Sequence, residues 1–180
     1  MRVASSGRWG CQTWEHEARS GWGADTTLAL QTAVLRGDDM LIEKVLYRAQ
    51  ATATGGRDTR AVSSDGVLDL NLTRPRELGG ANGRGTNPEQ LFAAGYAACF
   101  LEAIKLVASR DGTSLPLGTA VEVSVGMGPI RHGFGMEVEL KISLPGLARA
   151  EVDLLVEKAH TVCSYSNATR DNIPIRLVLA

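Results

Sequence analysis

Alternation of apolar and polar residues is clearest at positions 134–144, in the segment FGMEVELKISL. A period of two places the two kinds of side chain on opposite faces of an extended chain. The segment therefore predicts a β-strand with one buried face, paired in a hairpin with the preceding segment 118–128. The apolar face is predicted to consist of Phe134, Met136, Val138, Leu140 and Ile142.

A helical pattern begins at Asn87, whose side-chain oxygen suits the capping of a free backbone N–H. Pro88 fits the first helical position, where a missing N–H costs nothing, and Gln90 is placed to reach back as in a capping box. Gly112 is a typical residue for ending such a helix. The sequence thus predicts a helix across 87–112.

A second amphipathic helix is predicted at 146–163, with apolar residues spaced to form one stripe. The stripe consists of Leu147, Val152, Leu155, Val156 and Ala159. Strands are predicted at 41–55 and 173–180, and 61–72 predicts a hairpin with its turn at Asp65–Gly66. The order β-β-β-α-β-β-α-β indicates an α+β fold with antiparallel, hairpin-rich sheets and two main helices.

Residues 1–39 differ in composition from the rest of the chain. All three tryptophans lie there among Gly, Ser and Arg, and no strand alternation is present. We expect 1–39 to be an N-terminal appendage, disordered or partly helical. The orderly pattern that follows predicts a single domain at 40–180, a length that suits one hydrophobic core.

The charge and composition of the chain argue against several classes of partner and site. The 19 Lys plus Arg residues nearly balance 20 Asp plus Glu residues, so we expect neither nucleic acid nor an anionic membrane as a partner. We find no run of the roughly 18 apolar residues that a membrane span needs and no secretory leader, which predicts a cytoplasmic protein. Three widely spaced cysteines exclude a secreted disulfide framework, and the three histidines have no metal-ligand spacing.

Two cysteines lie at positions that suggest redox chemistry. Cys99 lies in the middle of the first predicted helix, where a cysteine is usually an inert core residue. Cys163 ends the second helix, before the polar stretch SYSN, so we expect it to be accessible to solvent. Either both thiols are inert, or they meet and perform redox chemistry.

Redox work requires a thiolate, because the thiol is a poor nucleophile. Cys99 lies too far into its helix to use the helix dipole, and burial would raise its pKa, so a cation must come from elsewhere. Arg57, in the glycine-flanked TGGRD turn, is a candidate, and Glu89 could hold it in place. Otherwise Arg57 is a solvated turn charge, and Glu89 is an acid favoured by the helix N-terminus.

The sequence at these residues resembles the organic hydroperoxide resistance proteins, in the superfamily of the osmotically inducible protein C. The resemblance covers 40–180 and rests on four stretches: ATATGGRD, SSDGVLDLNLTRPRELGG, GTNPEQLFAAGYAACF and AHTVCSYSNATRDNI. It implies a homodimeric, cysteine-based peroxidase without bound metal or flavin. Dihydrolipoyl groups, as an external dithiol, are the implied reductant of the enzyme.

The resemblance also implies a role for each matched residue. Cys99 corresponds to the peroxidatic cysteine and Cys163 to the resolving cysteine, with which it forms a disulfide. Arg57 corresponds to the arginine that activates the thiolate, and Glu89 to its acidic partner. Ser164 stands where many members have proline, which puts nothing catalytic in doubt, and Cys11 has no counterpart.

The spacing of Glu89 and Cys99 suggests a site shared between chains. Ten residues along one helix separate them by about 15 Å in height and about 80° in azimuth, beyond the reach of a glutamate. If Glu89 orients Arg57 beside a thiolate, an unbroken helix favours the Cys99 of a partner subunit. The arrangement predicts an intertwined homodimer with two equivalent sites.

Three alternatives remain open. A sister branch of the superfamily would use a broader range of peroxides, although the SNATR stretch favours the hydroperoxide resistance branch. A non-enzymatic redox sensor or binding module would use the Cys99–Cys163 pair as a switch, without turnover. A structural domain would have two inert thiols that react slowly with alkylating probes.

Overall fold

The structure is a computed structural model that describes residues 41–55, 59–81 and 83–180. The predicted appendage at 1–39, together with Cys11 and Arg57, lies outside the described residues. The described elements follow the predicted order, with one short helix and one 3-10 turn added. They are β1 (Ala51–Thr54), β2 (Arg60–Ser63), β3 (Asp69–Asn71), η2 (Arg76–Leu78), α1 (Pro88–Asp111), β4 (Ala120–Ile130), β5 (Gly133–Ser143), α2 (Arg149–Val162), α3 (Ser164–Thr169) and β6 (Ile175–Leu179).

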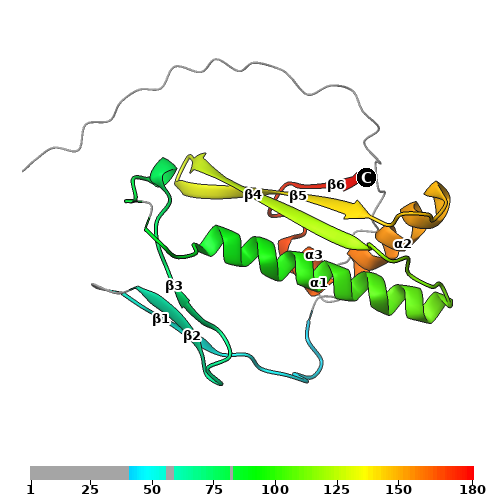
Figure 1. Ribbon diagram of the computed structural model, residues 1–180, viewed down its shortest axis with the longest axis horizontal. Coiled ribbons are helices and arrows are strands. Elements are labelled where there is room, and N and C mark those ends of the chain that lie inside the picture. The colour runs from blue at the N-terminus through cyan, green and yellow to red at the C-terminus, as the bar shows by residue number, and fades with distance from the viewer. Residues whose placement is uncertain (1–40, 56–58, 82) are drawn as a thin grey trace, which may run out of the picture.

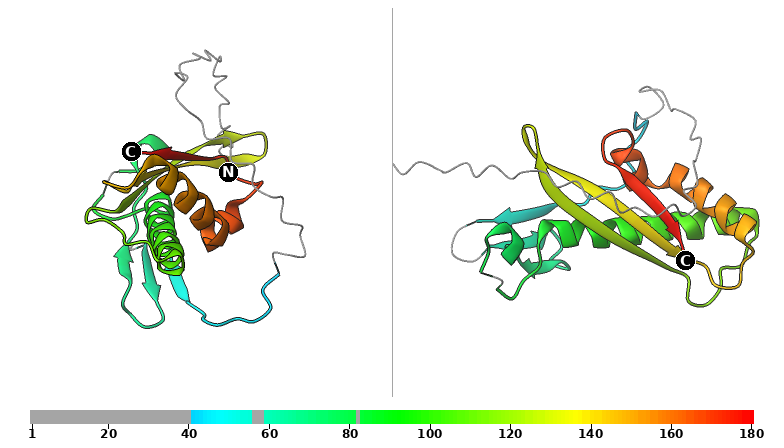
Figure 2. Two further views of the ribbon diagram at one scale, coloured as in Figure 1. Left: turned by 90° about the vertical axis from the view of Figure 1, so that its right-hand side faces the viewer. Right: turned by 90° about the horizontal axis from the view of Figure 1, so that it is seen from above.

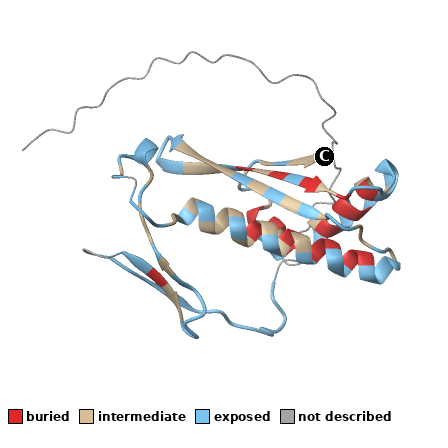
Figure 3. Cartoon of the chain, viewed as in Figure 1, coloured by how far each residue is buried: buried red, intermediate tan, exposed pale blue. Residues whose placement is uncertain are grey.

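A layer of helices covers one face of the β4–β5–β6 sheet, and this pair of layers encloses the hydrophobic core (Figures 1 and 2). The predicted alternation of β5 is confirmed at Val138, Leu140 and Ile142, which are all buried. Phe134, at the far end of the strand, is instead 70% exposed, because the tip of the β4–β5 hairpin extends beyond the helices (Figure 3).

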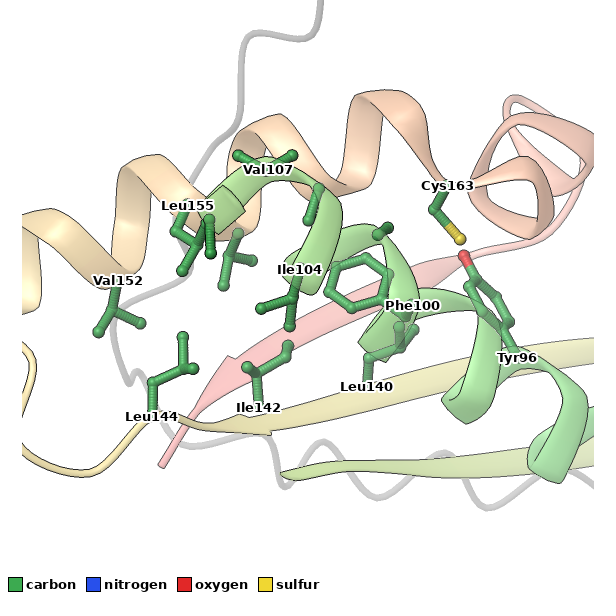
Figure 4. Close-up of a cluster of buried hydrophobic side chains, with 14 of the residues drawn as sticks. Tyr96, Phe100, Ile104, Val107, Leu140, Ile142, Leu144, Val152, Leu155 and Cys163 are labelled. Carbon is green, nitrogen blue, oxygen red and sulfur yellow. The ribbon is translucent and has the colours of Figure 1, made fainter. Parts of the chain in front are cut away.

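The helices contribute their predicted apolar faces to the same core (Figure 4). On α1, three large side chains are fully buried: Tyr96, Phe100 and Ile104. The predicted stripe of the second helix is confirmed at its four members within α2, which are Val152, Leu155, Val156 and Ala159. The α+β fold predicted from the sequence is therefore confirmed.

The last strand differs from the predicted hairpin arrangement. β6 pairs with β5 in parallel, with Leu140 opposite Leu177. A parallel neighbour requires a crossover connection, and α2 and α3 provide it by carrying the chain back along the sheet. The sheet is therefore mixed, because β4 and β5 remain antiparallel as predicted.

The ends of α1 are set by the residues that the sequence indicated. Asn87 is the N-cap and its side-chain oxygen accepts a hydrogen bond from the Gln90 amide at 2.8 Å. The predicted capping box also needs the Gln90 side chain to reach back to the Asn87 backbone amide. The Gln90 side-chain oxygen instead accepts a hydrogen bond from the Thr86 hydroxyl at 2.8 Å. Gly112 ends the helix in the left-handed region, at φ 67°.

The exclusion of any membrane-length apolar segment was too strict. Within the described residues, α1 is long and apolar enough to cross a membrane by length and hydropathy alone. Its 24 residues also serve as the central helix of the core, with Phe100 and Ile104 fully buried. A core helix meets the same length and hydropathy criteria, so this property alone is weak support for a membrane location.

The N-terminal strands form a separate sheet, in the order β1–β2–β3, which lies below the start of α1 in Figure 1. The predicted hairpin with its turn at Asp65–Gly66 is confirmed. The strand predicted at 41–55 is limited to Ala51–Thr54, because β2 offers a partner to four residues only. Apolar residues before β1 are exposed on the single chain: Leu41, Ile42, Val45, Leu46 and Tyr47.

A candidate thiol active site

Two cysteines from different helices meet at one end of the core. The Cys99 sulfur lies 3.3 Å from the Cys163 sulfur, and both are free thiols. Cys99 lies about three turns into α1, whereas Cys163 is the junction residue that ends α2 and begins α3. Of the arrangements that the sequence left open, the structure therefore favours paired thiols.

Cys163 was predicted to be accessible to solvent, but it is the less exposed of the two thiols. Cys163 is 1% exposed, whereas Cys99 is intermediate in exposure. The expectation of an accessible Cys163 was wrong because the polar stretch after it folds into α3, which leaves the thiol in the core cluster. A hydroperoxide from solvent would therefore meet Cys99 first.

Ser164 is a site residue that the sequence analysis did not identify. Its hydroxyl oxygen lies 3.3 Å from the Cys99 sulfur. Burial raises the pKa of Cys99, but hydrogen bonds from the Ser164 hydroxyl and the Tyr165 amide outweigh burial and hold that pKa below its ordinary value. The expected effect of burial on the Cys99 pKa is therefore present, but these hydrogen bonds reverse the net direction of the shift.

The second thiol is shifted in the opposite direction. Burial raises the pKa of Cys163, and the neighbouring Cys99 raises it further. Of the two thiols, Cys99 is therefore the one that ionises more readily. Because the thiolate form of cysteine is the nucleophile, this difference favours Cys99 over Cys163 as an attacking group.

Aromatic rings pack beside the thiols and fix the start of α3. Tyr165 lies 6.0 Å from Phe92 and 5.6 Å from Tyr96, measured between ring centroids. Gly95 permits this approach, since a Cβ at that position would lie 2.9 Å from the Tyr165 hydroxyl oxygen. The close contact of α3 with α1 keeps Cys163 and Ser164 against Cys99.

Glu89 lies on the first turn of α1 and is half-buried. The helix runs unbroken from Pro88 to Asp111, so the separation of Glu89 from Cys99 follows regular helix geometry. Within the described part of the chain, no ion pair or hydrogen bond of the Glu89 side chain is present. Since Arg57 lies outside that part, the proposed Arg57–Glu89 contact stays a prediction.

Among the described residues, the side chains around the two thiols do not form a set of metal ligands. Over the described ranges, no group of three or more His, Cys, Asp or Glu side chains lies close enough together to hold a metal ion. The groups that the structure places around the two sulfurs include the Ser164 hydroxyl and the backbone amides of Ser164 and Tyr165.

Removing the Ser164 hydroxyl is expected to raise the pKa of Cys99. In Ser164→Ala we expect alkylation of Cys99 by iodoacetamide at pH 7 to slow by about threefold to tenfold, since hydrogen bonds to a charged group are moderately strong. The inflection of the alkylation rate should move to higher pH. Ser164→Thr, which keeps a hydroxyl, serves as the control, and an unchanged pH profile in the alanine variant would remove Ser164 from the site.

Comparisons with known proteins show which proteins this chain is similar to. A family model described as OsmC-like protein matches residues 80–178. An organic hydroperoxide resistance protein of Xanthomonas axonopodis pv. citri is 63% identical over 138 residues, which cover 77% of this chain and 97% of that protein. Organic hydroperoxide resistance protein OhrA of Bacillus subtilis is 40% identical over 136 residues, or 75% of this chain and 96% of that protein.

Solved structures show the same fold. The organic hydroperoxide resistance protein of Elizabethkingia anophelis matches with a TM-score of 0.73 and 48% identity, covering 76% of this chain and 98% of that chain. OhrB of Bacillus subtilis matches with a TM-score of 0.69 and 40% identity, covering 76% of this chain and 100% of that chain.

Proposed function

Because the chain belongs to the organic hydroperoxide resistance proteins of the OsmC-like family, we propose that it reduces organic hydroperoxides to alcohols by cysteine chemistry. The names of its relatives support a role in peroxide detoxification. The observation that carries the cysteine mechanism is the 3.3 Å approach of Cys99 to Cys163 together with their opposite pKa shifts. A cytoplasmic location stays a prediction from the sequence.

In the first step, the Cys99 thiolate attacks the distal oxygen of the hydroperoxide. The O–O bond breaks, the sulfur becomes a sulfenic acid, and the alkoxide takes a proton and leaves as an alcohol. The lowered pKa of Cys99 supports this role, because it increases the thiolate fraction at neutral pH. Its partial exposure leaves a path for the substrate.

In the second step, the Cys163 sulfur displaces hydroxide from the sulfenic acid and forms a disulfide with Cys99. Their sulfurs already lie 3.3 Å apart, so only a small movement is needed to reach bonding distance. Disulfide formation protects Cys99 from irreversible oxidation to the sulfinic acid. An external dithiol, which we propose to be a dihydrolipoyl group, then reduces the disulfide by exchange.

We further propose that Arg57 and Glu89 complete the site from a second copy of the chain. Arg57 would stabilise the thiolate and the charge that develops on the peroxide oxygens. The unbroken α1 supports this arrangement, since it separates Glu89 from the Cys99 of its own chain. The exposed apolar residues from Leu41 to Tyr47 also support a dimer, because they gain burial only against another surface.

Subunit mixing tests the shared site. Arg57→Ala and Cys99→Ser chains should each be inactive, whereas a heterodimer of the two regains one full set of residues in one of its two sites. We expect steady-state peroxidase activity to reappear after subunit exchange that is verified by mass spectrometry of the mixed dimer. Absence of activity in a verified heterodimer would show that each site is built within one chain.

The proposed function itself is tested by steady-state turnover. With dihydrolipoamide as the electron donor, the protein should reduce tert-butyl hydroperoxide and fatty-acid hydroperoxides over many cycles. A redox sensor would consume one equivalent of peroxide per site and then stop. A protein with inert thiols would consume none, and either result would overturn the peroxidase proposal.

A further inference from the structure

A chain of hydroxyl and imidazole groups, buried at Tyr96 and Ser166 and half-buried at His160, lies next to Cys163. Its centre is Ser166, whose side chain is fully buried. The Ser166 hydroxyl oxygen lies 3.0 Å from the Tyr96 hydroxyl oxygen and 3.0 Å from Nδ1 of His160. The proposed peroxide reduction uses none of these three residues.

The same serine also reaches the resolving thiol. The side chain and the backbone amide of Ser166 both favour the ionised form of Cys163 and lower its pKa, against the larger effect of burial. Figure 4 shows the Cys163 sulfur and the Tyr96 hydroxyl pointing toward each other at this end of the core. The Ser166 hydroxyl therefore interacts with both the Cys163 thiol and His160.

We propose that His160 is the base of the resolving step, and that it receives the proton of the Cys163 thiol through the Ser166 hydroxyl. This inference rests on the proposed function, because it assigns a proton acceptor to its second step. A proton acceptor is needed because Cys163 must lose its proton to attack the sulfenic acid. Cys163 is only 1% exposed, so bulk water has little access to its thiol.

The charge state of His160 suits a base. Burial lowers the pKa of His160, and the positive charge of Arg170 lowers it further, so the ring is neutral at pH 7. Burial raises the pKa of Tyr96, so its hydroxyl stays protonated and does not compete for the proton. The other ring neighbour of His160 is Phe100, which is apolar, at 6.3 Å between ring centroids.

The step balances as follows. The Cys163 S–H proton passes to the Ser166 oxygen while the Ser166 O–H proton passes to Nδ1 of His160. The Cys163 sulfur then forms the S–S bond as the S–O bond of the Cys99 sulfenic acid breaks. The hydroxide that leaves takes up one proton and becomes water, and His160 returns to its neutral form by releasing the proton that it received. No external oxidant or reductant takes part.

A purely structural role for the same network makes a different prediction. If His160 only holds Ser166 in place, an uncharged acceptor at the position of Nδ1 should serve equally well. Asparagine offers this test, because its side-chain oxygen can accept the Ser166 hydrogen bond but cannot take a proton at neutral pH.

The experiment follows one turnover of His160→Asn after mixing with one equivalent of tert-butyl hydroperoxide. Sulfenic acid is trapped with dimedone, disulfide is quantified by mass spectrometry, and both are sampled between pH 5.5 and 10. His132→Asn is the matched control, since His132 is exposed in the β4–β5 turn. It should leave both rates as in the wild type.

At pH 7 we expect disulfide formation in His160→Asn to be slower by about a hundredfold or more, as is typical for loss of a general base. The deficit should shrink as pH rises, because Cys163 then ionises without help. Ser166→Ala, which removes the bridging oxygen, should show the same pH-dependent deficit. Sulfenic acid formation, which does not involve this relay, verifies that each variant is folded.

The possible outcomes distinguish the proton relay from a structural role of His160 and from failure of the proposed function. Disulfide formation in His160→Asn at the wild-type rate and with the wild-type pH profile would overturn the relay while the peroxidase proposal stands. A deficit of equal size at every pH would also overturn it, because that result indicates a structural role. If the wild type itself forms neither sulfenic acid nor disulfide, the proposed function fails first.

Discussion

Replacing Cys99 with serine is expected to reduce hydroperoxide consumption to the uncatalysed background, even with excess dithiol. The hydroxyl is not ionised at neutral pH and lacks the polarisable sulfur that attacks the O–O bond. Serine is close to cysteine in size and Cys99 is only partly buried, so the fold should be retained. Peroxide disappearance measured with a ferrous-oxidation assay, beside circular dichroism, checks both statements.

Cys163→Ser is the matched variant and should behave differently. It keeps the attacking thiol, so it should consume one equivalent of peroxide and form the Cys99 sulfenic acid. Without a resolving thiol, further peroxide should convert Cys99 to the sulfinic acid, detected as a mass increase of two oxygen atoms. Peroxide reduction by Cys99→Ser at the wild-type rate would reverse the assignment of the two cysteines.

Truncating Phe100 to alanine is expected to lower the free energy of unfolding by about 3–5 kcal/mol. Phe100 is fully buried between α1 and the sheet, so truncation leaves a cavity that the rigid helix cannot close (Figure 4). For a chain of 180 residues this corresponds to a fall of about 6–20 °C in Tm.

The control for this prediction is Leu117→Ala. Leu117 is 99% exposed, and its truncation should change the free energy of unfolding by less than about 0.5 kcal/mol. Urea unfolding followed by far-ultraviolet circular dichroism measures both variants. Equal losses in the two would contradict the placement of Phe100 at the centre of the core.

Elements with local signals could be predicted from the sequence. Asn87, Pro88 and Gly112 mark the ends of α1 because capping depends on a few adjacent residues. The strand around Leu140 was evident because a half-buried strand alternates with a period of two. The parallel direction of β6 could not be predicted this way, since pairing with β5 depends on how α2 and α3 return the chain.

The candidate site also contains residues that could be predicted from the sequence and residues that could not. Cys99 and Cys163 could be singled out as residues, and the resemblance to a family paired them. Their 3.3 Å approach and their unequal exposure arise from α3, a six-residue helix too short to show a period. Ser164 and Ser166 were missed for this reason, because only the fold of α3 brings one hydroxyl to Cys99 and the other to Cys163.

The central claim is that Cys99 and Cys163 form one peroxide-reducing pair, and peptide mapping of the wild-type protein tests it most directly. The reduced protein is treated with one equivalent of tert-butyl hydroperoxide, the remaining thiols are alkylated, and the digest is analysed by mass spectrometry. We predict a disulfide that joins the Cys99 and Cys163 peptides, with one equivalent of tert-butanol released and Cys11 alkylated. Full alkylation of Cys99 and Cys163 after the peroxide has been consumed, or a disulfide that joins Cys11 to either of them, would contradict the claim.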